Sequence, residues 1–168
     1  MGVAAAFIFV AQAVDFPVIG GTGHLLGFTL AAVLVGPYAA AVVMAAVLIV
    51  QCFIFQDGGL TALGANIFNM SFVGTAGGYF IYLGLKKLRP RHRRGSGLFL
   101  VGLAAWSSVV IAAIFYSVEL AASGAFPFKI LLSSMVLIHA IIGIAEAVIT
   151  CLVIGFISKV RPDLICKL

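Results

Sequence analysis

Charged residues are scarce in this chain of 168 residues. Asp, Glu, Lys and Arg make up 9% of it, whereas 64% is hydrophobic and the mean hydropathy is +1.27. A soluble domain is about half apolar and about a quarter charged, so this composition excludes a soluble globular protein. The three cysteines, Cys52, Cys151 and Cys166, show no CxxC or Cys/His spacing. They indicate neither a disulfide framework nor a cysteine metal site.

Catalytic signatures are also missing. The sequence contains no P-loop, HExxH or GxSxG motif, and such motifs mark nucleotide, metalloprotease and hydrolase sites. We therefore predict that the protein is not an enzyme and has no ATPase site of its own. If it transports a substrate uphill, another subunit has to supply the energy.

What the sequence does contain is a series of long apolar runs. They do not alternate polar and apolar residues as the strands of a membrane barrel would, and most are long enough to cross a bilayer as helices. We predict an all-α, polytopic membrane protein with one transmembrane domain over residues 1–168. Its six helical segments, of which the second is short, are Met1–Phe16, Leu25–Val35, Tyr38–Phe55, Asn66–Leu85, Leu98–Ala122 and Phe128–Ser158.

The formal charge of +5 reports orientation rather than nucleic-acid binding. Six of the ten Lys and Arg residues lie between positions 86 and 94, and three more lie in the tail. Positive loops stay in the cytoplasm, so we predict that the loop 86–96 and the tail 159–168, with the C-terminus, are cytoplasmic. Two spans separate these clusters, which returns the chain to the same side. The loop Asp57–Asn66 and the turn near Lys129 are then outside, and Met1 is inside.

The loop Gly20–Gly27 carries four glycines and His24 between two apolar segments. Glycine allows positive φ angles and close approach of the main chain to a ligand, and neutral histidine is the commonest metal ligand. A metal site is one interpretation. The alternative is a tight turn with an interfacial histidine, because a lone histidine is weak evidence for a metal.

Further polar side chains share the predicted outer face with this loop. Thr22, Asp57, Asn66 and Asn69 could orient a ligand or attract cations. Asn66 is predicted to open its helix as an N-cap, and Asn69, three residues later, lies on the same helix face. The truncated helix after the glycine loop is typical of transporter sites. Together these features predict an outward-facing pocket for a small ligand.

Two ionisable residues lie deep in the last span. His139 and Glu146 are seven residues apart and share one helix face with Gly143. Ionisable groups inside a membrane are costly and are usually functional or paired. A proton or ion relay is one interpretation; a structural role in packing the bundle is preferred, because no second intramembrane charge completes a relay.

Several stretches together resemble one family. They are Phe16-Pro17-Val18, Gly21–Gly27, Gly36-Pro37, Asp57–Thr61, Leu63–Met70, His139–Gly143 with Glu146, and Val160–Asp163. In this order they resemble CbiM/NikM, the substrate-capture components of energy-coupling-factor transporters for cobalt and nickel. The resemblance implies capture of Co(II) or Ni(II) near the outer face of a bacterial or archaeal cell membrane. It also implies a transmembrane coupling subunit, cytoplasmic ATPase subunits and a small accessory membrane subunit as partners.

In that family the metal is held by the N-terminal amine, a histidine at the second position and the loop histidine that matches His24. This chain begins Met1-Gly2, and the family's first helix does not precede it. We consider a start site placed too far downstream, a fragment, or a degenerate protein without metal binding. Capture of another small substrate such as a vitamin, and a non-binding assembly subunit, stay open as functions. Cobalt and nickel both accept nitrogen ligands, so the sequence does not choose between them.

Overall fold

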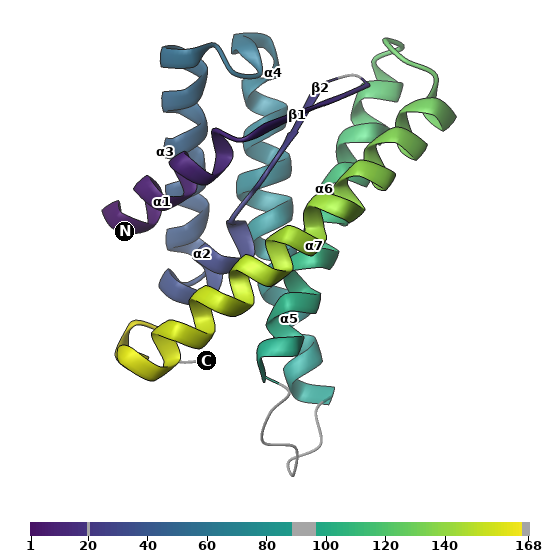
Figure 1. Ribbon diagram of the computed structural model, residues 1–168. Coiled ribbons are helices and arrows are strands. Elements are labelled where there is room, and N and C mark those ends of the chain that lie inside the picture. The colour runs from purple at the N-terminus through teal and green to yellow at the C-terminus, as the bar shows by residue number, and fades with distance from the viewer. Residues whose placement is uncertain (20, 89–96, 166–168) are drawn as a thin grey trace.

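A computed structural model describes residues 1–19, 21–88 and 97–165, with the side chains of residues 15–18, 21 and 22 outside that description (Figure 1). The chain is helical apart from one two-stranded hairpin. Its elements are α1 (Gly2–Gln12), β1 (Asp15–Val18), β2 (Gly21–His24), α2 (Phe28–Val35), α3 (Pro37–Phe55), α4 (Gly59–Asn66), the π-helix η1 (Ile67–Gly74), α5 (Thr75–Leu88), α6 (Gly97–Ala122), α7 (Phe128–Val160) and the short 3₁₀-helix η2 (Pro162–Leu164).

Six helical segments result, because α4, η1 and α5 follow one another without leaving helical backbone angles. The described part of the chain thus confirms the predicted helical architecture with one short segment, α2. Among the described residues, α3, α6 and α7 are each long and apolar enough to cross a bilayer. α1 has only 11 residues, whereas a span needs about 20.

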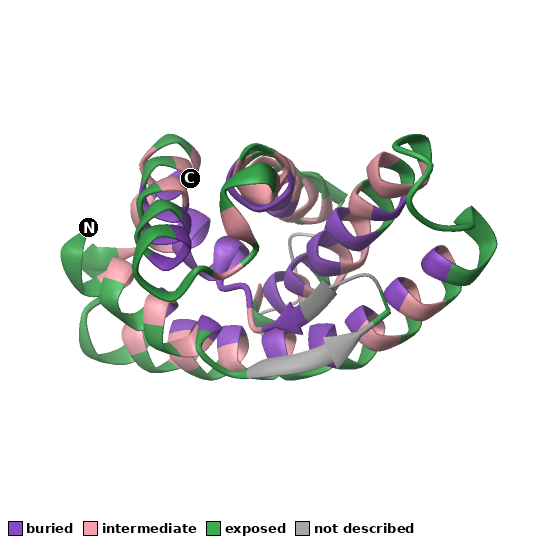
Figure 2. Ribbon diagram, turned by 90° about the horizontal axis from the view of Figure 1, so that it is seen from above, coloured by how far each residue is buried: buried purple, intermediate pink, exposed green. Residues whose placement is uncertain are grey.

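The short helix α2 lies in the middle of the bundle (Figure 1). Residues Phe28 to Val33 are all buried, as expected of a helix that is apolar on every side. Phe28 and Met44 belong to the main core cluster, and Gly78 of α5 lets Thr29 of α2 approach its backbone. Seen from above, the buried helix faces turn inward and the exposed faces turn outward (Figure 2).

The glycine loop differs from the prediction. Instead of an irregular loop, it forms the second strand of an antiparallel hairpin in which Asp15 pairs with His24 and Pro17 with Thr22. The predicted first helix is consequently too long, since α1 ends at Gln12 and the chain is extended by Asp15. Proline inside a helix removes a hydrogen bond and clashes with the preceding turn, which favours the early end.

The start of the helix predicted over Asn66–Leu85 was also wrong. Residues 60–65 are helical rather than a loop, and Asn66 lies inside the composite helix rather than capping it. The turn before it is tighter than expected, because Gln56 and Gly58 adopt positive φ angles of 56° and 68°. The helix therefore begins at Gly59, directly after the turn.

The two ends of the bundle differ in charge. The described basic residues Lys86 and Lys87 end α5, and Lys159 ends α7. Both helix ends lie at the same end of the molecule, away from the α3–α4 and α6–α7 turns (Figure 1). The described residues of the two positive clusters therefore share one end of the bundle.

Candidate functional site

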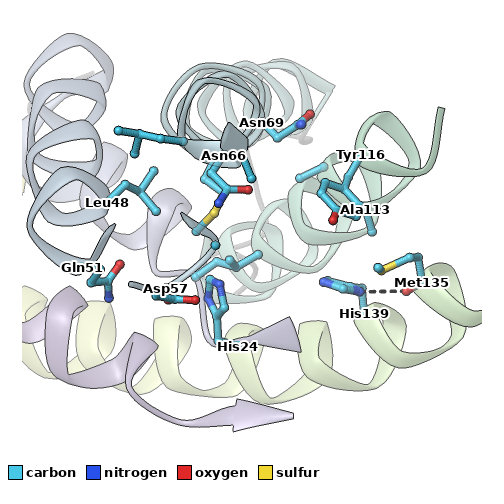
Figure 3. A pocket seen from close by; sticks show the side chains of 16 residues that line it. His24, Leu48, Gln51, Asp57, Asn66, Asn69, Ala113, Tyr116, Met135 and His139 are labelled. Carbon is cyan, nitrogen blue, oxygen red and sulfur yellow. Dashed lines mark hydrogen bonds between the residues drawn. The ribbon is translucent and has the colours of Figure 1, made fainter. Parts of the chain in front are cut away.

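A cavity of about 340 Å³ opens between the glycine hairpin and the helices. Residues from the β2–α2 connection, α3, α4, η1, α6 and α7 line it (Figure 3). The structure brings four of the sequence candidates together here, namely His24, Asp57, Asn66 and Asn69, and adds His139. The predicted polar pocket thus has a physical counterpart in which residues more than 100 positions apart meet.

His24 ends β2 and points into this cavity (Figure 3). The residue is buried, with 9% of its surface exposed. Its Nδ1 lies 3.4 Å from the Leu25 carbonyl oxygen, which is a long contact for a hydrogen bond. Among the described residues, no group hydrogen-bonds to Nε2. That nitrogen is available to a ligand in the cavity.

The backbone just after His24 is held by two side chains. The carboxylate of Glu146 accepts the Leu26 N–H at 3.0 Å and the Gly27 N–H at 2.6 Å. From the other side, Gln12 donates its Nε2–H to the Leu26 carbonyl at 3.0 Å. Gly27 has a φ of 71° and immediately precedes α2, so Glu146 satisfies N–H groups that a helix N-terminus otherwise leaves unpaired. These contacts fix the loop that carries His24.

Asn69 has a strong partner on α6. Its Nδ2 donates to Glu119 at 2.6 Å and to the Ala65 carbonyl at 3.1 Å. Asn69 lies in the π-helix η1, and π-helical turns are frequent at functional sites. Its Oδ1 is buried without a hydrogen-bond partner among the described residues. That buried oxygen therefore remains unsatisfied.

The other polar candidates are placed less uniformly. Asp57 is half-buried in the α3–α4 turn, and Asn66 faces the same cavity from α4. The backbone of Thr22 belongs to β2, but its side chain lies outside the described part.

His139 occupies a position that sequence reasoning did not assign. It lies on the cavity wall and points into the cavity, as His24 does (Figure 3). Its Nδ1 lies 2.8 Å from the Met135 carbonyl, so Nδ1 carries the proton and donates it, and Nε2 is left as an acceptor. His139 and Glu146 do not contact the same groups: one faces the cavity and the other holds the loop.

Sequence reasoning missed two glutamines. Gln12 and Gln51 are almost completely buried, with 1% and 5% of their surfaces exposed. Each is a polar residue inside an apolar helix, a signal that was present in the sequence but points to no location by itself.

In the described part of the chain, no group of three His, Cys, Asp or Glu side chains could hold a metal ion together.

A helical membrane protein with a polar cavity beside a buried, unpaired histidine nitrogen is the class that fold and site define. The chain matches the family model "Cobalt uptake substrate-specific transmembrane region" (CbiM) over residues 1–164. It belongs to the CbiM family, which confirms the resemblance. Members of this family are transport components rather than enzymes.

Relatives and solved structures agree with this membership. The chain is 42% identical over 167 residues to a protein of Archaeoglobus fulgidus named "Putative fused nickel transport protein NikMN", covering 98% of this chain and 54% of the relative. It is 37% identical to a cobalt transport protein CbiM of Carboxydothermus hydrogenoformans, covering 93% and 64%. A crystal structure of a transition metal transporter superposes with a TM-score of 0.85 at 31% identity, covering 94% of this chain and 74% of that one. The chain thus spans between half and two thirds of these two relatives' lengths.

Proposed function

We propose that this chain is the metal-capture membrane component of an ATP-driven energy-coupling-factor importer for cobalt or nickel. The observation that carries the proposal is the buried imidazole of His24, with Nε2 unpaired on a polar cavity and its loop held by Glu146 and Gln12. Imidazole suits late transition ions, including Ni(II). A fixed loop reduces the cost of ordering the ligand when the ion binds.

In this proposal His24 is the ligand and its neighbours assist. Asp57 attracts the cation to the cavity, while Asn66 and Asn69 orient the water or ligands around it. One imidazole is too few for a tight divalent site. The family resemblance assigns two further nitrogens to the N-terminal amine and a histidine at the second position.

Orientation and partners complete the proposal. The shared end of Lys86, Lys87 and Lys159 supports a cytoplasmic placement of the loop 86–96 and the tail 159–168, with the C-terminus. Residues 89–96 and 166–168 lie outside the described residues. The cavity then opens toward the opposite, outer side of the cell membrane. A transmembrane coupling subunit, ATPase subunits and a small accessory membrane subunit would act from beside and below this bundle.

The two alternative functions fit the cavity less well. A vitamin-binding pocket should be lined by several aromatic residues, whereas among the described lining residues Tyr116 is the aromatic one. A non-binding assembly subunit gives no reason for the unpaired buried oxygen of Asn69 beside a cavity that His24 lines, because buried polar groups are normally satisfied.

Titration calorimetry with Ni(II) and with Co(II) in detergent tests the proposal. His24→Ala should weaken binding by about tenfold or more, since a lost metal ligand commonly removes at least 1.4 kcal/mol. His92→Ala is the matched control, because His92 lies in the basic segment far along the chain from the cavity residues. Equal binding by the wild type and His24→Ala would contradict the proposed site.

A further inference from the structure

His139 contributes a second imidazole to the wall of the cavity that His24 lines. We propose that Nε2 of His139 accepts a hydrogen bond from a water ligand of the Co(II) or Ni(II) ion that His24 coordinates. His139 is then a positioning residue for the hydrated ion and not a direct ligand. The inference rests on the proposed function, because the ion that His139 positions is the one held by His24.

The ring of His139 is held in one orientation. Its Nδ1 donates a hydrogen bond of 2.8 Å to the carbonyl of Met135, one turn earlier in α7, which leaves Nε2 as an acceptor. A bond from Nδ1 to a backbone carbonyl fixes both the tautomer and the direction of the ring, as it does for histidines at metal sites. The lone pair of Nε2 is thereby directed before any ion arrives.

This nitrogen is accessible from the cavity. Among the described residues, no group hydrogen-bonds to Nε2 of His139, and Nε2 is not one of the fully buried polar atoms without a partner. The unpaired oxygens of Gln12, Gln51 and Asn69 are of that fully buried kind. The imidazole of His139 instead points into the cavity, as that of His24 does (Figure 3). A water molecule in the cavity can therefore reach Nε2.

One helix positions both imidazoles. His139 and Glu146 are seven residues apart in α7, which is about two turns, so they share one helix face. The carboxylate of Glu146 accepts the N–H groups of Leu26 and Gly27, directly after the hairpin strand that ends with His24. The two rings are therefore placed relative to each other by a rigid element. An ion can be held between them without ordering a flexible segment.

The cavity is large enough for an ion that keeps most of its water. Six waters occupy about 180 Å³ at about 30 Å³ each, and the cavity has a volume of about 340 Å³. An ion that exchanges one water for the imidazole of His24 retains other water ligands, which donate hydrogen bonds. Nε2 of His139 can only accept one, so the two groups are complementary. Outer partners of this kind commonly contribute about 10–100-fold in metal affinity.

Titration calorimetry with Co(II) and with Ni(II) on the full chain in detergent tests the inference. His139→Leu removes the acceptor and should weaken binding by about tenfold. His139→Gln should stay within about threefold of the wild type, because its amide oxygen can accept from the same water. In a His24→Ala background, His139→Leu should change binding by less than about twofold, since no ion is then held beside Nε2.

Leu131→Met is the matched control. Leu131 lies on the same buried face of α7, about two turns before His139, but is not part of the cavity wall. The substitution nearly conserves volume, so its effect on binding should be less than about twofold. Equal weakening by Leu131→Met and His139→Leu, or equal weakening by His139→Gln and His139→Leu, would overturn the inference. A tenfold loss from His139→Leu that persists in the His24→Ala background would also overturn it.

The same titrations separate this inference from the proposed function. If His24→Ala weakens metal binding and His139→Leu does not, the role of His139 is refuted and the proposed function stands. If His24→Ala leaves binding unchanged, the proposed function fails, and the role of His139 fails with it.

Discussion

Buried polar groups behave differently in two neighbouring regions of the bundle. Around the Leu26–Gly27 loop they are satisfied: Glu146 accepts two backbone N–H groups and Gln12 donates to a carbonyl. On α1, α3 and η1 they are not: oxygens of Gln12, Gln51 and Asn69 have no hydrogen-bond partner among the described residues. The same side chain, Gln12, takes part in both regions, with its nitrogen in one and its oxygen in the other.

This difference indicates which buried polar groups stabilise the fold and which are available to a ligand. A satisfied buried group stabilises the fold, and its removal should lower stability. An unsatisfied one costs stability and is retained where a ligand completes it. Mutations in the first region should therefore change unfolding, while mutations in the second should change binding.

The largest effect is expected at Glu146. Glu146→Leu leaves two buried N–H groups without an acceptor, at a cost of about 1–3 kcal/mol each. We expect about 2–6 kcal/mol of lost stability, measured by thermal unfolding in detergent. Glu146→Gln should fall between, because an amide keeps one acceptor and turns an NH₂ group toward the other donor. Unfolding of Glu146→Leu at the wild-type temperature would contradict the structural role.

Gly78 lies next to a second pair of buried polar groups that are satisfied, the hydroxyls of Thr29 and Ser108. Thr29 and Ser108 share a hydrogen bond of 2.8 Å, and a methyl group at position 78 would collide with the Thr29 hydroxyl and lie 3.2 Å from Ser108 Cβ. Gly78→Ala should therefore cost about 1–3 kcal/mol by overpacking.

The neighbouring glycine provides the control. A methyl group at Gly77 meets nothing within 4 Å, so Gly77→Ala should raise helix stability by about 0.5–1 kcal/mol. A lower melting temperature for Gly77→Ala than for Gly78→Ala would show that the α2–α5 contact is not as close as described.

The two buried glutamines allow the satisfied and the unsatisfied region to be compared with the same substitution, Gln to Leu. Gln12→Leu removes the donor to the Leu26 carbonyl and should cost about 1 kcal/mol. Gln51→Leu removes an unsatisfied oxygen and should leave stability unchanged or slightly higher. Parallel melting curves of both variants check this. Equal destabilisation by both variants would remove the distinction between the regions.

The smallest effect is expected in the C-terminal tail, beyond the last membrane-spanning helix. Arg161 donates from Nε at 2.9 Å and from Nη2 at 2.8 Å to the carboxylate of Asp163, and this hydrogen bonding lowers the pKa of Asp163. A depressed carboxylate pKa stabilises the folded state above the usual aspartate range near pH 3.9, and the contribution is lost as pH falls through the lowered value. Because both side chains are exposed, salt screens the pair.

Melting curves from pH 7 to pH 3 test this sign. Wild type should lose slightly more stability on acidification than Asp163→Asn, and high salt should reduce the gap. A larger acid loss in Asp163→Asn would reverse the expected linkage.

The sequence predicted the long helices well because their ends are marked. Pro127 precedes α7, and polar or glycine-rich turns bound α3 and α6. The class of protein followed from composition, and the polar pocket followed from charge topology, which placed His24 and Asp57 on one face. These signals are local or additive along the chain.

The errors share a different cause. The hairpin depends on pairing between Asp15 and His24, and the early start at Gly59 depends on a tight turn with a positive φ at Gln56. The structural role preferred for Glu146 was no error, but its partner Leu26 lies 120 positions away and could not be named, nor could the contact of Gln12 across 14 positions. Tertiary contacts of this kind leave no periodic pattern in a single sequence, so they could not be predicted.

The central claim is that the unpaired nitrogen of His24, rather than another histidine, receives the metal. Nitrogen-15 spectra of the three imidazoles at His24, His92 and His139 test it directly, because bound paramagnetic Co(II) broadens the signal of the nearest ring first. We expect substoichiometric metal to broaden the His24 ring signals before those of the other two histidines. Selective broadening of His92 or His139 with a sharp His24 signal would contradict it.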